Sequence, residues 1–144
     1  MIKKRIKKTE LLLSIDLCLI AVIACNWAQG KDAAEKGVEQ FHNQLNAGQF
    51  KEIYAQADES FKSAAKEEDA IALFDAVKRK LGDVKKASPM GFFANTNTSG
   101  TFVTLTYETE FSEGKATEKF IFKINGEKAL LYNYNIDSSL LITK

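Results

Sequence analysis

The stretch Val103-Thr104-Leu105-Thr106-Tyr107-Glu108-Thr109-Glu110-Phe111 decides the fold of this chain. Apolar and polar side chains alternate along it with a period of two, which is the pattern of a β-strand with one buried face. The apolar set is Val103, Leu105, Tyr107 and Phe111. The stretch therefore predicts a half-buried strand, with Glu108 and Glu110 on the side that faces away from the core.

Three further strands are predicted around this one. Downstream, residues 119–124 alternate in the same way, Asn125-Gly126 is a strong hairpin signal, and residues 130–136 form the last strand. The alternation places Leu130, Tyr132, Tyr134 and Ile136 on one face of that strand. Upstream, residues 84–94 are expected to be extended, with Pro89 marking an edge or a bend. Four consecutive strands with short turns predict an antiparallel sheet.

The residues before the sheet have a helical period. Apolar side chains recur at spacings of three and four from Asp32 to about residue 47, from about 50 to 57 and from about 66 to 81. Asp32 is the expected N-cap of the first helix, and Gly48 and Gly82 are suited to end the first and third helices. The predicted fold class is α+β, with three N-terminal helices on one face of a curved four-stranded antiparallel sheet.

A basic head and an apolar run precede the predicted helices. Five of the 20 lysines and arginines lie in the first eight positions, and LLLSIDLCLIAVIA follows over residues 11–24. A helical membrane span needs about 20 apolar residues, so this run is short for a span and has the length typical of a secretory signal peptide. Asp16 interrupts the run, and the alternative interpretation is a cytosolic protein with an amphipathic N-terminal helix.

The apolar run ends in Val22-Ile23-Ala24-Cys25, which resembles the lipobox of bacterial lipoproteins. The resemblance implies cleavage before Cys25, a diacylglyceryl thioether on its sulfur, and acylation of the new amino group. Two or three acyl chains give stable anchoring, whereas a single chain is marginal. The alternative is an ordinary signal peptidase cut at the same place.

These features divide the chain into a signal peptide (1–24), a tether (25–31) and one domain (32–144). Asn26, rather than an aspartate, follows Cys25, which favours the periplasmic face of the outer membrane if the host is Gram-negative. The predicted mature chain loses five basic and two acidic residues from totals of 20 and 19, so its formal charge is −2 instead of +1. A strongly basic bias is missing, so nucleic acid is not an expected partner.

Nearly the whole predicted domain, residues 31–139, resembles a family of small uncharacterised bacterial exported proteins. The resemblance rests on the order and spacing of short motifs: Ala47-Gly48-Gln49-Phe50, Tyr54, Ala57-Asp58, Phe61-Lys62, Leu81-Gly82, GTFVTLTY at 100–107, Phe111, Glu118-Lys119-Phe120 and Tyr134-Asn135-Ile136. It implies a cystatin-like, or nuclear transport factor 2-like, fold. The family has no established activity, so the resemblance implies a fold and no reaction.

Residues that carry chemistry are sparse in the sequence. His42 is the single histidine, and no nucleophile or acidic partner stands at a defined spacing from it, so it is interpreted as a structural histidine at an interface. No catalytic residue, metal ligand set or cofactor motif is expected. The concave face of such a fold binds small apolar ligands in some relatives, and the candidate pocket-lining residues are Phe74, Tyr107, Tyr132 and Tyr134. Aromatic side chains at a period of two are, however, more typical of a packed core than of a pocket lining.

Three functional hypotheses remain open on the sequence. The leading one is a lipid-anchored envelope protein, not an enzyme, whose domain binds a small apolar ligand or an envelope protein. The second is an enzyme of the isomerase or dehydratase kind, which needs an inward-facing carboxylate in an accessible cavity; Glu108 and Glu110 are expected to face outward. The third is a protein inhibitor or assembly accessory of the envelope that presents a loop such as residues 95–100.

Overall fold

A computed structural model describes residues 28–142. The predicted signal peptide and Cys25 lie outside the described residues. The chain first forms an N-terminal helix, described over residues 28–46. The later elements are α2 (Phe50–Gln56), α3 (Glu59–Ala64), α4 (Glu67–Leu81), β1 (Val84–Asn97), β2 (Gly100–Phe111), β3 (Lys115–Asn125), β4 (Lys128–Asp137) and α5 (Ser139–Ile142).

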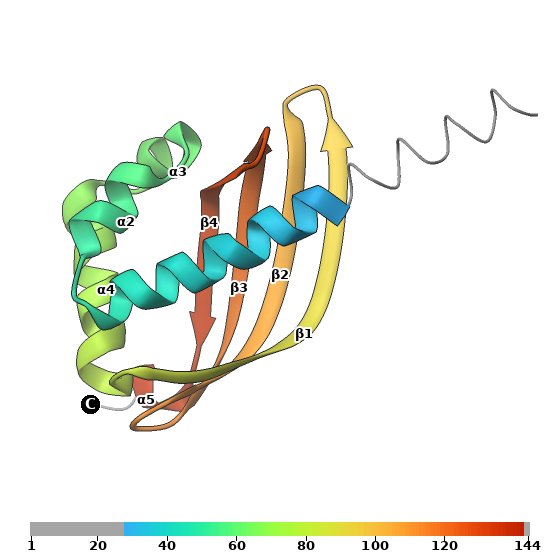
Figure 1. Cartoon of the computed structure of the whole chain (residues 1–144). Coiled ribbons are helices and arrows are strands. Elements are labelled where there is room, and N and C mark those ends of the chain that lie inside the picture. Colours follow the sequence, from blue (N-terminus) through green and yellow to red (C-terminus); the bar gives the residue numbers. More distant parts are fainter. Residues whose placement is uncertain (1–27, 143–144) are drawn as a thin grey trace, which may run out of the picture.

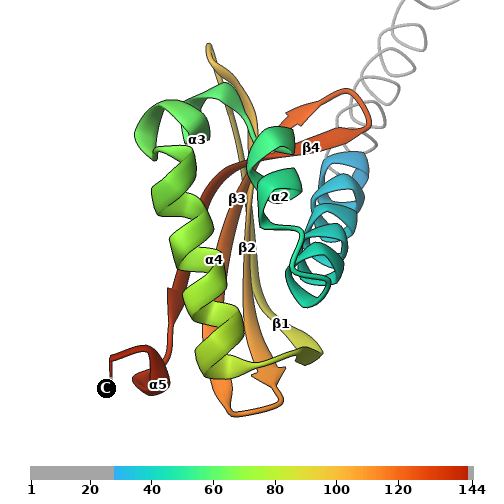
Figure 2. The ribbon, with the colours of Figure 1, turned by 90° about the vertical axis from the view of Figure 1, so that its left-hand side faces the viewer.

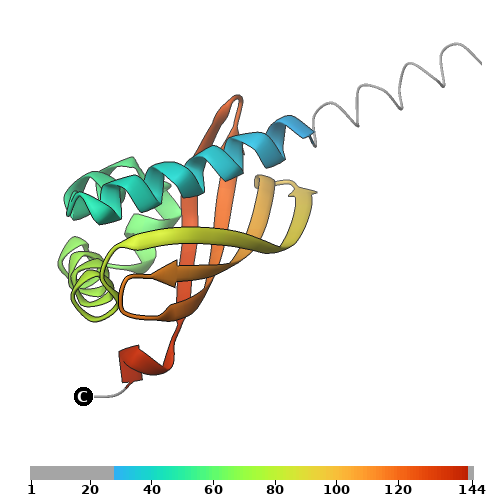
Figure 3. The ribbon, with the colours of Figure 1, turned by 60° about the horizontal axis from the view of Figure 1, so that its bottom comes forward.

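The four strands form one antiparallel sheet in the order β1-β2-β3-β4, so each strand pairs with its neighbour in the chain. The sheet curves around the N-terminal helix, which crosses it diagonally (Figures 1 and 3). Helices α2, α3 and α4 gather beside the N-terminal helix (Figure 2). The predicted fold class, α+β with a curved antiparallel sheet, is therefore confirmed.

The core fills the space between the helices and the inner face of the sheet. Val103, Leu105, Tyr107 and Phe111 of β2 are all buried, and Glu108 and Glu110 lie on the other face, as the alternation predicts. An aromatic cluster occupies the centre of the core. Phe41 of the N-terminal helix contacts Tyr134, Phe120 and Phe74, with ring centroids 4.7, 5.1 and 5.6 Å away.

The helical part of the chain differs from the prediction in number and in bounds. Five helices lie in residues 28–142 instead of three. Residues 58–62 lie outside the three predicted helices, but Asp58 accepts a hydrogen bond from the Ser60 backbone N–H at 2.9 Å and so caps a further helix, α3. The N-terminal helix already includes residues 28–31, which the sequence pattern assigned to the tether, so Asp32 lies inside the helix and is not its N-cap. None of the helices in this part of the chain is long and apolar enough to cross a membrane.

The predicted facing of β4 is wrong because the strand contains a bulge. Ile121 pairs with Asn133 and Phe122 pairs with Leu131, so Tyr132 is an extra residue opposite β3. One extra residue shifts a strand with a period of two to the other face. Leu131 and Tyr134 are therefore both buried, whereas Tyr132 packs on Phe102, 4.9 Å between ring centroids, on the outer face of the sheet.

Candidate functional site

A carboxylate lies in the middle of the apolar core. Glu118 is on β3, two residues before Phe120, and the alternation of the strand turns both side chains inward. The Glu118 side chain is 0% exposed. Burying an isolated charge costs far more than one side-chain packing contact returns, so a buried carboxylate requires hydrogen-bond donors around it.

Three side chains from three other elements supply those donors. The Tyr134 hydroxyl on β4 donates to Glu118 Oε1 at 2.7 Å. The Thr109 hydroxyl on β2 donates to Oε2 at 2.5 Å, and His42 Nε2 on the N-terminal helix lies 2.7 Å from the same oxygen. Every buried side-chain nitrogen and oxygen in residues 28–142 has a hydrogen-bond partner. We call these four residues the Glu118 network.

The groups around Glu118 suit a carboxylate that accepts hydrogen bonds at the centre of the network. Burial raises the pKa of the Tyr134 phenol well above 10.0, and the neighbouring Glu118 charge and hydrogen bond act in the same direction. Tyr134 therefore stays protonated and remains a donor. Nε2 of His42 is the ring nitrogen that contacts the Glu118 carboxylate, and Nδ1 is the other ring nitrogen.

His42 connects the buried network to the surface. It lines a groove of about 300 Å³ between the N-terminal helix and β1, which we call the histidine groove. The hydrogen bond to Glu118 uses Nε2, while His42 is itself among the residues that line this groove. The other lining side chains include Glu35, Glu39, Lys85, Lys86 and Tyr107. The histidine groove thus places an imidazole beside charges of both signs.

Tyr107 stands at the wall of the histidine groove. Burial raises the pKa of its phenol above 10.0, and the negative charge of Glu35 adds to the rise, while Lys31 opposes it. Lys31 and Glu35 form an ion pair one helical turn apart, 2.5 Å from Nζ to Oε1. Tyr107 therefore presents a neutral hydroxyl that can donate to a ligand.

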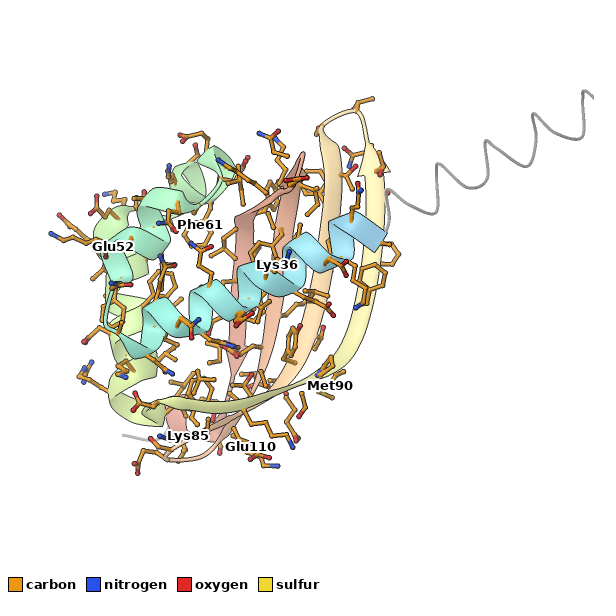
Figure 4. All side chains as sticks on the ribbon, in the orientation of Figure 1. Lys36, Glu52, Phe61, Lys85, Met90 and Glu110 are labelled. Atoms are coloured by element: carbon orange, nitrogen blue, oxygen red, sulfur yellow. The ribbon has the colours of Figure 1, made fainter. Side chains whose placement is uncertain are left out.

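A second and larger groove lies on the other side of the N-terminal helix. It holds about 450 Å³ between that helix, α2 and the β3–β4 hairpin, and we call it the helix–hairpin groove. Its apolar lining residues include Phe41, Ile53, Phe122 and Leu131, and its polar ones are Lys36, Gln40, Gln44, Gln56, Glu127 and Lys128. Lys36 projects from the middle of the N-terminal helix (Figure 4). Pockets of this size, with an apolar surface and a few polar groups, are typical of small-ligand sites.

Local sequence features set the shape of the helix–hairpin groove. The side-chain amides of Gln40 and Gln44 both donate to the side-chain Oε1 of Gln56, at 2.6 and 3.0 Å, and so connect the N-terminal helix to α2. Gly37 lets the helix approach the sheet, because a Cβ there would lie 2.8 Å from the Phe122 ring. The groove is therefore walled by elements that contact one another directly.

The structure separates the four aromatic residues that were predicted to line a pocket. Phe74 and Tyr134 are buried in the aromatic cluster of the core. Tyr107 lines the histidine groove. Tyr132 lies on the outer face because of the β4 bulge. The four side chains therefore do not share one pocket. Cys25, the predicted lipid attachment residue, precedes the described residues.

Two features of the site were missed on the sequence. Glu118 shares its face with Phe120 and Phe122, so extending the period-two pattern by one step would have shown an inward carboxylate. Its pairing with His42, 76 positions away, has no sequence signal because only the fold brings β3 and the helix together.

Within residues 28–142, no group of three or more histidine, cysteine, aspartate or glutamate side chains is placed so that it could hold a metal ion.

The chain matches a protein-family model over most of its length. No curated protein matches the chain. A family model described as a protein of unknown function, DUF3887, matches residues 38–130, which is well over half of the chain. This range includes three of the four residues of the Glu118 network and ends before Tyr134. The chain therefore belongs to the DUF3887 family of proteins of unknown function.

Proposed function

We propose that this protein is a lipid-anchored protein of the bacterial envelope whose domain, of the cystatin-like or nuclear transport factor 2-like kind, binds a small amphipathic ligand. The observation that supports binding is the helix–hairpin groove, with its apolar surface and polar rim. The observation that supports the anchor is the basic-then-apolar leader ending in Cys25. In a Gram-negative host the domain stands on the periplasmic face of the outer membrane.

The lining of the groove indicates the chemistry of the ligand. Phe41, Phe122 and Leu131 suit an apolar body such as an acyl chain or a fused ring. Two lysines, Lys36 and Lys128, and one glutamate, Glu127, stand among the polar groups, so the rim carries a net positive charge. The proposed ligand has an apolar body and an anionic head. The C-terminal segment of an envelope protein also combines apolar side chains with an anionic carboxylate. The test below uses a small molecule and so separates a small ligand from such a protein partner.

A dansyl-labelled fatty acid tests the proposal. We expect its fluorescence to rise on binding, and Lys36→Glu to raise Kd about fivefold, since reversing one exposed charge at the rim of the groove changes binding by about 1 kcal/mol. Lys51→Glu is the matched control, because Lys51 is an exposed lysine on α2 outside the groove lining. No binding, or equal effects of the two variants, would refute the helix–hairpin groove as the ligand site.

A second candidate function is acid–base catalysis in the histidine groove. It is favoured by one specific observation: the inward carboxylate that such an enzyme needs is present as Glu118, hydrogen-bonded to His42 at 2.7 Å. A carboxylate that holds Nε2–H fixes the imidazole orientation and leaves Nδ1 to take a proton from a bound molecule. Glu118 acts here as a positioning residue, and His42 as the base.

Ring opening of 5-nitrobenzisoxazole reports such a base. The base removes the proton on the ring carbon, the N–O bond breaks, and a cyanophenolate is released. If the second candidate is right, the protein accelerates this reaction over buffer and His42→Gln abolishes the acceleration. Glutamine keeps an N–H donor for Glu118 but has no basic nitrogen. Equal rates for the wild type and for His42→Gln would rule the second candidate out.

A further inference from the structure

The most exposed apolar side chains of the sheet lie together on its edge strand. Met90, Phe92 and Phe93 of β1 are 63%, 44% and 64% exposed, and we call them the β1 patch. In Figure 4 Met90 lies at the outer edge of the sheet, away from the helices on the opposite side of the molecule. Large exposed apolar side chains that gather along one edge of a sheet mark a surface that contacts another molecule or a membrane.

The geometry of β1 is unsuited to adding a strand from another chain. Pro89 has no backbone N–H, and the pairing register shifts between Pro89 and Gly91, so Met90 forms a bulge on the edge strand. Phe92 pairs with buried Leu105 and Phe93 pairs with Thr104 on the opposite face, so the two rings project from opposite faces of the same strand. Because the rings project from both faces of the edge strand, a lipid bilayer that surrounds the edge can contact both of them, whereas a flat protein surface would contact one.

The two strand segments that carry and flank the β1 patch hold no charged side chain. Residues 87–107 include no lysine, arginine, aspartate or glutamate. Lys85 and Lys86 lie at the start of β1, where Lys86 pairs with Glu110 of β2. Insertion of the β1 patch into a bilayer therefore carries no charged side chain of these segments into the apolar region.

The start of the N-terminal helix places the predicted anchor close to the β1 patch. Gly30 packs against β2 and β3, where an added Cβ would lie 3.7 Å from the Val103 side chain and 3.8 Å from Ile124. Val103 pairs with Ala94, the residue that follows Phe93 on β1. Cys25 precedes Gly30 by five residues, and five residues span at most about 18 Å. A lipid on Cys25 therefore enters the bilayer near the β1 patch.

We infer that the β1 patch is a membrane-docking surface that inserts Met90, Phe92 and Phe93 into the bilayer to which Cys25 is attached. The inference rests on the proposed lipid anchor. Insertion to the depth of the headgroup–acyl boundary, about 5–10 Å, accommodates aromatic side chains at the interface. Docking fixes the orientation of the domain, so that α2 and α4 face away from the membrane (Figures 1 and 2).

Fluorescence quenching by brominated lipids tests this orientation. The lipid-bearing full protein is extracted from cell membranes and reconstituted into vesicles of equimolar phosphatidylethanolamine and phosphatidylglycerol with brominated acyl chains. Trp27 is the single tryptophan and is first replaced by phenylalanine. Phe93→Trp then reports the patch, and Glu52→Trp is the matched control, because Glu52 lies on α2 on the opposite side of the molecule (Figure 4).

We expect the emission of the tryptophan at 93 to fall by about half on brominated vesicles, because bromines near the interface lie within its depth, and the emission at 52 to stay unchanged. Equal quenching at the two positions, or none at 93, would overturn the inference. A blue shift at 93 that depends on protein concentration and not on lipid would assign the patch to a second copy and would also overturn it. The intact mass of the protein shows separately whether acyl chains are attached. If the chains are present and no quenching occurs, docking is refuted and the anchor is not. If the chains are missing, both the anchor and the docking that rests on it are refuted.

Discussion

The imidazole of His42 lies 2.7 Å from the fully buried carboxylate of Glu118, 76 positions later in the chain. This contact joins the N-terminal helix to the third strand of the sheet. Tyr134 and Thr109 complete the ring of donors, so helix, β2, β3 and β4 all meet at one side chain. The Glu118 network is therefore both a structural junction and the inner end of the histidine groove.

The first prediction concerns the stability that Glu118 provides. Glu118→Ala should lower the free energy of unfolding by about 3–5 kcal/mol, because it leaves three buried donors without their acceptor. Glu118→Gln should cost less, about 1–3 kcal/mol, because the amide oxygen still accepts. Urea unfolding measures both. Glu110→Gln, on the exposed face of β2, is the control and should change stability by no more than about 0.5 kcal/mol. A cost for Glu118→Ala as small as that of the control would contradict the role of the network.

A second prediction follows from the raised pKa of Tyr134. Because the folded-state pKa lies above the unfolded value of 10.0, the unfolded chain loses this proton first as the pH rises. The stability that the neutral phenol provides is thus complete below pH 10 and declines above it, by about 1.4 kcal/mol per pH unit until the folded pKa is reached.

Unfolding measured between pH 9 and 11 checks this decline. Tyr134→Phe should be less stable at neutral pH, because Glu118 loses a donor, and should show a shallower decline above pH 10. Tyr107, whose pKa is also raised, accounts for a remaining slope. Tyr132→Phe, on the outer face, should keep the full decline. An identical slope in wild type and Tyr134→Phe would show that Tyr134 does not titrate as described.

The third prediction concerns Gly37 and the wall of the helix–hairpin groove. Alanine favours a helix over glycine by about 1 kcal/mol, yet its Cβ would lie 2.8 Å from the buried Phe122 ring. Overpacking costs about 1–3 kcal/mol, so Gly37→Ala should lower the melting temperature. In a Phe122→Leu background the same change should become neutral or stabilising. Destabilisation in both backgrounds would assign the glycine another role.

Two glycines that end helices provide a fourth, paired prediction. Gly48 and Gly82 both have positive φ, at 71° and 80°. A Cβ on Gly48 meets nothing within 4 Å, whereas one on Gly82 would lie 1.9 Å from the Ser112 hydroxyl. Gly48→Ala should therefore cost only the backbone strain, about 1 kcal/mol, and Gly82→Ala about 3 kcal/mol. Equal costs, measured by denaturant unfolding, would contradict the close approach at Gly82.

Local patterns in the sequence were sufficient to predict which way side chains face wherever one face of an element is buried. The alternation along residues 103–111 predicted the facing of β2 correctly, and Gly82 ended α4 as expected. The alternation failed at Tyr132, because a bulge depends on how β3 and β4 pair and not on the residues of β4 alone. Asp32 failed as a cap because Ala28 and its neighbours continue the helix toward the N-terminus.

The candidate site was less predictable than the fold. The inward facing of Glu118 follows from its position two residues before Phe120, but its donors come from elements 9, 16 and 76 positions away. The grooves depend on distances between helices and strands, which no single segment specifies. Of the predicted lining residues, Tyr107 reaches a groove because it lies near the β1 side of the sheet, whereas Phe74 of α4 and Tyr134 of β4 are buried in the core between the helices and the sheet.

Metabolic labelling with a palmitate analogue tests the proposed lipid anchor on Cys25. Wild-type cells should yield a labelled protein of the mature size, Cys25→Ser should remove the label, and Cys18→Ser, which lies within the predicted leader, should leave it unchanged apart from any effect on yield. Label retained in Cys25→Ser would contradict the proposed anchor.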